Sequence, residues 1–171
     1  MTAPTHPRIE AERVLSAFWP DRTLPVDPVA IARAMGLDVK QGELPEAISG
    51  VLVKRAGADA VILLAQNDNP NRKRFTCAHE LGHYVRRAGE AAIERLDFRG
   101  PLASTGLDPE EVFANQFAAN LLMPEAELRE AVQREQSVWL LSHRFGVSGE
   151  AMGYRLENLL GIPFERTETS H

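Results

Sequence analysis

His79, Glu80 and His83 have the residue types and the spacing of a metal-dependent catalytic helix. Residues four positions apart lie on the same face of an α-helix, about 6 Å apart along its axis. Two imidazoles at that spacing can hold one divalent metal ion, and the carboxylate beside the first can take a proton from a water that the metal activates. We therefore predict that His79 and His83 are metal ligands and that Glu80 is the catalytic base.

The residues around this motif favour the metal interpretation over a chance arrangement. The alternative is a surface helix with two solvated histidines, in a chain that contains five histidines. Apolar and small residues recur along the stretch and predict a helix that is buried on one side, where histidines need polar partners such as a metal. These residues are Phe75, Ala78, Leu81, Gly82 and Val85.

A catalytic metal site of this kind needs a third protein ligand, because such sites usually have three ligands and one water. We expect Glu111, on a helix predicted at 109–122, to be that ligand. Asn115 lies on the same face four residues later and can orient a histidine ligand by a hydrogen bond to the ring nitrogen that does not bind the metal. Glu110 is the rival ligand, about 100° around the helix, but Ala114 occupies its fourth position. Both glutamates would also be explained by the preference of helix N-termini for negative charge.

Peptide hydrolysis also needs a donor that stabilises the oxyanion. The candidate transition-state stabilisers are His143, if it faces the cleft, together with Tyr154 and Arg155; for His143 a structural or exposed role is the favoured alternative. Cys77 lies near His79 in sequence but on a different helical face. We therefore expect it to fill apolar space rather than to act as a nucleophile.

The composition indicates one soluble domain. The chain has 171 residues, 44% of them hydrophobic, and a net charge of -5, which disfavours a broad electrostatic grip on nucleic acid. We predict a single domain over 1–171 with its core at about 9–162 and frayed tails at both ends. The absence of an apolar run of about 20 residues, of a signal core and of a cysteine pair favours the cytoplasm and argues against a membrane. The basic cluster at 72–74 is interpreted as solvated charge, with substrate contact as the alternative.

The pattern of apolar residues and breakers predicts an α+β fold that is mainly helical, with a small three-stranded sheet and a C-terminal pair of helices resembling a helix-turn-helix. Residues 66–74 are expected to form a loop and residues 88–108 to be irregular. Asp27, Asp108 and Ser148 are expected to cap helices. The predicted helices are 9–18, 28–35, 74–87, 109–122, one from 124 through 132, and two within 138–162; the predicted strands are 37–41, 49–53 and 60–64.

Four stretches together resemble the ImmA/IrrE family of metallopeptidases. They are 74–83, which contains the histidine motif; 111–124; 26–36 with 48–50; and 145–156. The similarity covers about residues 9–162 and implies a zincin-like domain of the gluzincin kind. It also implies that His79, His83 and Glu111 bind the metal and that Glu80 is the base.

The sequence departs from the family pattern at two positions. Phe113 stands where many members carry a second glutamate, and Cys77 replaces an aliphatic residue. Neither is a proposed ligand, so activity is expected to survive. The chain ends near residue 171, and we expect no additional sensor domain within it.

The resemblance implies a metallo-endopeptidase that cleaves a specific protein, an Xre-type helix-turn-helix repressor, in a stress-response, mobile-element or toxin–antitoxin setting. The expected cofactor is one divalent ion, zinc in the first place, although manganese suits the same ligands. One alternative is a non-proteolytic repressor-binding or toxin–antitoxin component. A DNA-binding module at 138–160 is a weaker alternative, because Arg144 and Arg155 are balanced there by Glu150 and Glu157. The oligomeric state is not predicted.

Overall fold

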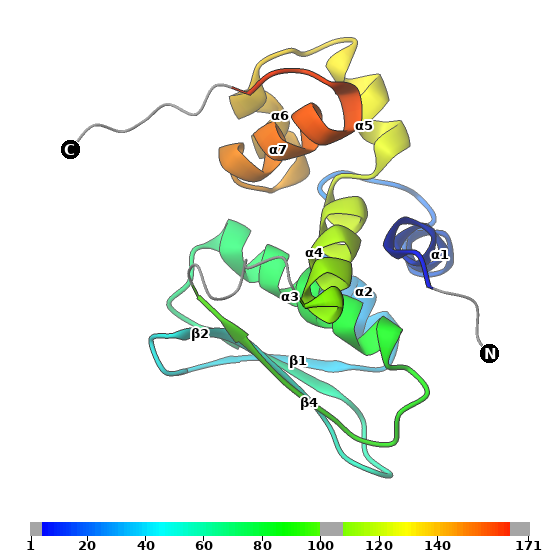
Figure 1. Ribbon diagram of the computed structural model, residues 1–171, viewed down its shortest axis with the longest axis vertical. Coiled ribbons are helices and arrows are strands. Elements are labelled where there is room, and N and C mark those ends of the chain that lie inside the picture. Colours follow the sequence, from blue (N-terminus) through cyan, green and yellow to red (C-terminus); the bar gives the residue numbers. More distant parts are fainter. Residues whose placement is uncertain (1–4, 100–107, 165–171) are drawn as a thin grey trace.

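The computed structural model describes residues 5–99 and 108–164. Within these residues the chain is α+β, as expected, with seven helices and one four-stranded mixed sheet (Figure 1). The helices are α1 Pro7–Phe18, α2 Pro28–Ala34, α3 Pro70–Arg86, α4 Pro109–Leu122, α5 Glu125–Val132, α6 Val138–Phe145 and α7 Gly149–Leu160. The strands are β1 Asp38–Gly42, β2 Ile48–Lys54, β3 Val61–Ala65 and β4 Ile93–Phe98. The ends predicted to fray fall partly outside the described residues, as does 100–107.

The sheet has the strand order β1-β3-β2-β4. The consecutive strands β2 and β3 pair in an antiparallel register and form a hairpin. β1 runs parallel to β3, and β4 pairs antiparallel with β2 at the other edge. The sheet therefore has one edge strand in parallel pairing, β1, and one in antiparallel pairing, β4. Strand β4 is the edge that adjoins the histidine motif on α3.

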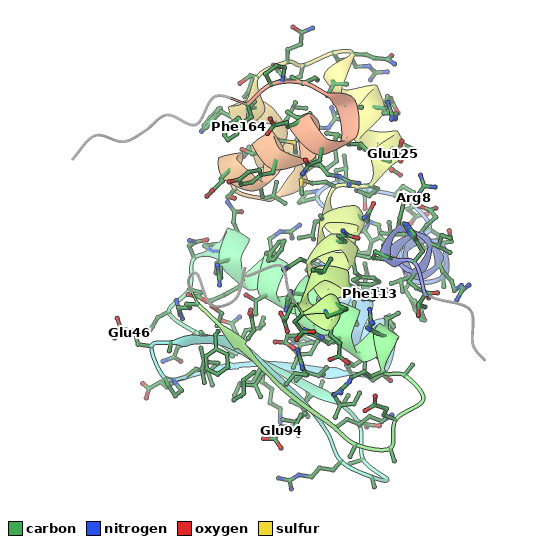
Figure 2. All side chains as sticks on the ribbon, viewed as in Figure 1. Arg8, Glu46, Glu94, Phe113, Glu125 and Phe164 are labelled. Carbon is green, nitrogen blue, oxygen red and sulfur yellow. The ribbon has the colours of Figure 1, made fainter. Side chains whose placement is uncertain are left out.

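The prediction of only three strands was wrong, and so was that of irregular structure at 93–98, because these residues form β4. Its side chains alternate, but Arg95 and Asp97 face the helices together with Ile93, whereas Leu96 and Phe98 are exposed. Glu94 also points away from the helices (Figure 2). Apolar residues thus alternate on the solvent side, which reverses the pattern from which strands are usually recognised.

Helix α3 begins four residues before the predicted start at 74. Asn69 caps it, its side chain accepting a hydrogen bond from the Arg72 backbone N–H at 2.9 Å, and Pro70 occupies the first turn. The Asn-Pro pair that suggested a loop is therefore a helix start, where proline loses no hydrogen bond. The residues from Thr76 to His83 are all buried, so α3 is the central element of the molecule.

The interpretation of 72–74 as solvated charge was also wrong for both arginines. The Arg72 guanidinium donates to the Ser49 hydroxyl at 3.1 Å. Arg74 donates to the Gly146 carbonyl at 2.9 Å and to the Val26 carbonyl. These two arginines connect α3 to the sheet and to the turn between α6 and α7.

The expected helix caps are confirmed at three positions. Asp27 accepts from the Val29 backbone N–H at 2.9 Å, Asp108 from that of Glu110 at 2.9 Å, and Ser148 from that of Ala151 at 3.1 Å. The last cap starts α7 directly after Gly146, which has φ +65° and ends α6. The C-terminal helical pair predicted from this turn is therefore present, and it lies beyond the end of α4 that is farther from the sheet (Figure 1).

Helices α3 and α4 approach each other closely at Gly82. A Cβ atom added there would lie 3.1 Å from the Ala114 Cα and 3.2 Å from the Phe117 Cβ. Apolar side chains of both helices, including Leu81, Phe117 and Leu121, have no exposed surface. None of the helices in residues 5–99 and 108–164 has the length and apolar character of a membrane span.

Gly50 of β2 is where the sheet rests on α3, and it generates a stability prediction. A Cβ atom there would lie 2.4 Å from the Thr76 Cγ2 and 3.4 Å from the Glu80 Oε1. Gly50→Ala is therefore expected to lower the free energy of unfolding by about 1–3 kcal/mol, as overpacking does. Urea denaturation measures this loss. The control is Gly89→Ala, since nothing lies within 4 Å of its added Cβ; equal stability of the two variants would refute this account of the contact.

Candidate metal centre

His79, His83 and Glu111 bring three ligand atoms to one point between α3 and α4. The two imidazole Nε2 atoms are 3.1 Å apart. The Glu111 Oε2 lies 3.2 Å from the Nε2 of His79, and its Oε1 lies 3.1 Å from the Nε2 of His83. The two histidines are one helical turn apart, and the glutamate comes from the first turn of the facing helix.

The donor set fits one divalent ion. Ligands that stand about 2.0–2.1 Å from a tetrahedral metal are about 3.3 Å from one another, close to the spacings of 3.1 and 3.2 Å found here. Two imidazoles and one carboxylate are also the ligands of a known class of catalytic zinc sites, which leave the fourth position to water or substrate. The group therefore has the composition and the geometry of a catalytic rather than a purely structural metal site.

Asn115 fixes the orientation of His79. Its Oδ1 lies 2.9 Å from the Nδ1 of His79, on the side of the ring away from the ligand group. An amide oxygen can only accept, so Nδ1 carries the proton and Nε2 presents its lone pair to the site. Glu111 and Asn115 thus act from the same face of α4, one on each side of the imidazole.

Glu80 is fully buried, and neither of its carboxylate oxygens has a hydrogen-bond partner among the described residues. Burial raises the pKa of Glu80 to about 8. A carboxylate without hydrogen-bond partners in the protein can take a proton from a neighbouring water, and a raised pKa makes it a stronger base. Glu80 follows His79 directly in sequence, which places it beside the ligand group rather than in it.

Glu111 and its rival Glu110 have different partners. Side-chain contacts with His79 and with His83 lower the pKa of Glu111, which keeps it ionised. Glu110 instead pairs with Arg87 at 3.5 Å and with Arg95 at 3.3 Å. The structure therefore brings Glu111, and not Glu110, to the two histidines.

Two residues of β4 also face the site and were missed from the sequence. Arg95 forms an ion pair with the Glu111 Oε1, the same oxygen that lies beside His83, and so holds this carboxylate in place. Asp97 is half-buried, and burial raises its pKa. Both lie at alternate positions with Ile93, and that alternation was the signal by which they could have been found.

The other candidate residues are spread over α6 and α7. Tyr154 lines two cavities that Phe75 also lines, and the Phe75 ring centroid is 6.4 Å from that of His79. Arg155 donates to the Met123 carbonyl at 2.9 Å and to the Asn120 side chain at 3.0 Å, so it joins α7 to α4. His143 is exposed and stacks on Trp139, and the structure does not bring it to the ligand group.

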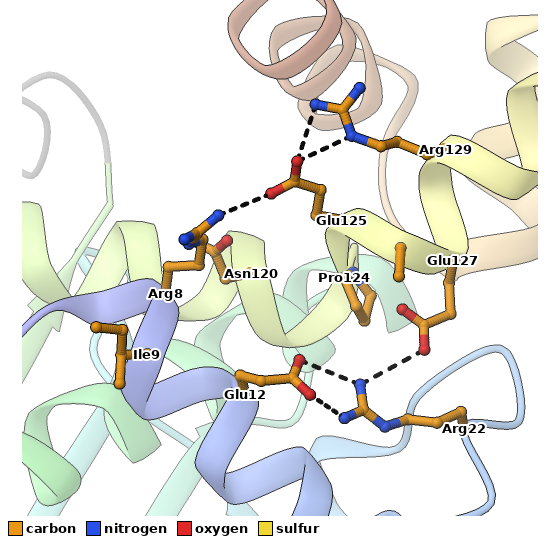
Figure 3. A pocket seen from close by; sticks show the side chains of 10 residues that line it. Arg8, Ile9, Glu12, Arg22, Asn120, Pro124, Glu125, Glu127 and Arg129 are labelled. Atoms are coloured by element: carbon orange, nitrogen blue, oxygen red, sulfur yellow. Dashed lines mark hydrogen bonds and ion pairs between the residues drawn. The ribbon is translucent and has the colours of Figure 1, made fainter.

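A third cavity, of about 610 Å³, lies between α1 and α5 (Figure 3). Two sets of ion pairs cross it. Arg8 joins Glu125 at 3.1 Å, while Arg22 bridges Glu12 and Glu127. Its charged side chains are thus paired with one another, and the cavity contains none of the metal-ligand residues.

Comparisons with known proteins agree with this geometry. Residues 37–157 match the family model described as the IrrE N-terminal-like domain, Peptidase_M78. No curated protein matches the sequence. Among solved structures, a Mycobacterium tuberculosis transcriptional regulator has a TM-score of 0.63 and 22% sequence identity, over 96% of this chain and 48% of that chain. This likeness shows a shared fold, and the present chain spans about half the length of that regulator.

The hydrogen bond to His79 predicts the effect of removing Asn115. Asn115→Ala is expected to weaken zinc binding about 10- to 100-fold while the fold is retained, because His79 loses its orientation. Competition with a chromogenic chelator measures the affinity, and circular dichroism checks the fold. The matched control is Gln116→Ala, an exposed neighbour on the same helix. Equal zinc affinities for the two variants would show that Asn115 does not position the ligand.

Cys77 is predicted to be chemically inert in the folded protein. Its side chain has no exposed surface, and burial raises the pKa of the thiol to about 12, so the reactive thiolate is scarce at pH 8. Alkylation by iodoacetamide at pH 8 should be at least about a hundredfold slower than in denaturant. Mass spectrometry of the modified protein measures both rates, and rapid modification of the native chain would restore the nucleophile interpretation.

Proposed function

The chain belongs to the IrrE N-terminal-like family of metallopeptidases, and from this membership we propose that it is a metal-dependent endopeptidase that cuts one specific protein substrate. The observation that supports this most strongly is the convergence of His79, His83 and Glu111 beside a buried Glu80 whose oxygens lack partners. A purely structural metal site would have no use for such a carboxylate.

The proposed chemistry assigns one role to each residue. A divalent ion held by His79, His83 and Glu111 would supply Lewis-acid chemistry, acidifying water and polarising the scissile carbonyl. Glu80 takes the proton of the attacking water and then delivers it to the leaving amine. Asn115 holds His79, and Arg95 holds Glu111, so that both ligands keep their orientation.

We assign the domain to the zincin-like folds and its ion to zinc. The helix that carries the motif packs against a mixed sheet whose edge strand adjoins the site, and the third ligand comes from the next helix. Two imidazoles and one carboxylate at tetrahedral spacing suit zinc, although manganese can bind the same set.

We propose an Xre-type helix-turn-helix repressor as the substrate, so that cleavage relieves repression in a stress, mobile-element or toxin–antitoxin response. The resemblance to the ImmA/IrrE family supports this assignment, as does the fold shared with a transcriptional regulator.

Glu80→Gln tests the chemistry. The amide keeps the shape of the side chain but cannot take a proton, so cleavage should fall by about 10²–10⁴-fold while zinc content is unchanged. The purified protein would be mixed with an Xre-type repressor encoded next to it, and fragments would be identified by mass spectrometry.

Two controls accompany this experiment, chelation of the metal and Glu80→Asp, which keeps a carboxylate. Fragments that disappear on chelation and in Glu80→Gln support the proposal. Cleavage by Glu80→Gln at the rate of the unmodified protein would refute the role of Glu80, and an intact repressor that binds the protein would favour sequestration over proteolysis.

A further inference from the structure

The helix faces that carry the metal ligands extend beyond the metal site. On α3, Phe75 lies one turn before His79 on the same face. On α4, Ala119 and Met123 continue the face that begins with Glu111 and Asn115. The ligand group thus occupies one end of a continuous surface that leads toward the N-terminus of α3 and the C-terminus of α4.

A groove lies over the far end of this surface, between α3, α4 and α7. Two cavities of about 760 and 460 Å³ share three residues, Phe75, Ala151 and Tyr154. One cavity extends over the start of α3 to Ser148 and Glu150 of α7. The other extends along α4 past Asn115, the residue that holds His79.

The walls of this groove are fixed by two half-buried arginines. Arg155 of α7 donates to the Met123 carbonyl at the end of α4. Arg74 of α3 donates to the Gly146 carbonyl in the turn before α7. A Cβ atom on Gly146 would lie 2.7 Å from the Arg74 Nε, so this turn is closely fitted to the arginine. The groove is therefore built into the fold and does not depend on a ligand to form.

The lining suits a polypeptide backbone. Side-chain amides recur along both cavities, and an amide group carries both donors and an acceptor, as a peptide backbone does. The oxygens of Asn69, Asn115 and Asn120 are already engaged by Arg72, His79 and Arg155. The shared centre is apolar, from Phe75, Ala151 and the Tyr154 ring. The amide residues are Asn69 and Asn71 in one cavity, and Asn115, Gln116, Asn120 and Asn158 in the other.

The charges in the groove do not favour a phosphate or a nucleic acid. The ionisable residues that line it are Arg72, Glu150 and Arg155. Arg72 is engaged with Ser49, and Arg155 with Met123 and Asn120. The groove thus lacks the concentration of exposed positive charge that phosphate binding needs.

We propose that this groove binds an extended segment of the protein substrate on one side of the scissile bond, with an apolar side chain seated between Phe75, Ala151 and Tyr154. This inference rests on the proposed peptidase function. The Phe75 ring centroid is 6.4 Å from that of His79, and an extended chain advances about 3.3 Å per residue. The apolar side chain is therefore expected about two to four positions from the cleaved bond.

The direct test fills the groove at its centre. Ala151→Trp places a large ring among Phe75, Tyr154 and the bound segment. Ala126→Trp is the matched control, because Ala126 is also a helical alanine that lines a cavity, the one between α1 and α5. Each variant would be loaded with zinc and given a mixture of peptides with randomised positions, and the products would be sequenced by mass spectrometry.

The wild-type chain should select an apolar residue within two to four positions of the cut on one side. Ala151→Trp should lower kcat/KM at least about tenfold, mainly through KM, whereas Ala126→Trp should not. Ala151→Leu should lower kcat/KM by a smaller factor and shift the preferred substrate residue toward smaller apolar side chains. This variant serves as the test if Ala151→Trp fails to fold. Equal kcat/KM for the folded Ala151 variants and the wild type, or no apolar preference in that window, would overturn the inference.

Binding distinguishes a failure of the groove from a failure of the peptidase function. The same peptides, labelled with a fluorophore, would be titrated with Glu80→Gln alone and with Glu80→Gln combined with Ala151→Trp, and followed by fluorescence anisotropy. One outcome is that the wild-type protein cleaves no peptide, while Ala151→Trp weakens binding at least about tenfold. That result would support the groove as a docking site and refute the proposed hydrolysis. Binding that is absent, or that is lost through Ala126→Trp instead, would refute the groove as the docking site.

Discussion

The contact between α3 and α4 at Gly82 is the constraint on which the site depends. The backbone of α4 reaches α3 there because no side chain intervenes, and the Ala114 Cα lies 3.1 Å from where a Cβ would be. Glu111 is three residues before Ala114, and His79 and His83 flank Gly82. The ligand atoms of two helices can meet at 3.1–3.2 Å only if the helix axes are this close. Small residues at this crossing are thus a requirement of the chemistry as well as of the packing.

Burying a carboxylate without hydrogen-bond partners lowers the free energy of unfolding, and Glu80 is buried in this way. Strand β2 packs against Glu80 through Gly50. A Cβ atom added to Gly50 would lie 3.4 Å from the Glu80 Oε1. Thr76, which packs against the same glycine, also has a buried hydroxyl without a hydrogen-bond partner among the described residues. Polar atoms left unsatisfied in this way are rare in folded proteins and concentrate at functional sites.

The sequence predicted those features that follow from local rules. Spacing along a helix related His79 to His83 and Glu111 to Asn115, and the structure brings these residues together. Cap residues such as Asp108 and Ser148 act within two or three positions, so they too could be recognised. The missed features depend on tertiary structure. β4 was hidden because Arg95 and Asp97 face inward, toward the site, and Arg74 was taken for a solvated charge because its carbonyl partners lie about 50 and 70 residues away in sequence.

The position of α7 is set by directional bonds rather than by apolar contact alone. Arg155 and Arg74 lose hydration when they are buried, and burial lowers the pKa of each guanidinium. An apolar contact could join the same elements at no such cost, but it would allow them to slide. Guanidinium groups bound to backbone carbonyls fix both distance and angle. A peptidase that cuts one bond must hold an extended segment in register with its catalytic base, and displacements near 1 Å are enough to lower rates strongly. For the proposed peptidase, the two half-buried arginines at the edges of the groove meet that requirement, because they hold α7 against α3 and α4 by directional bonds.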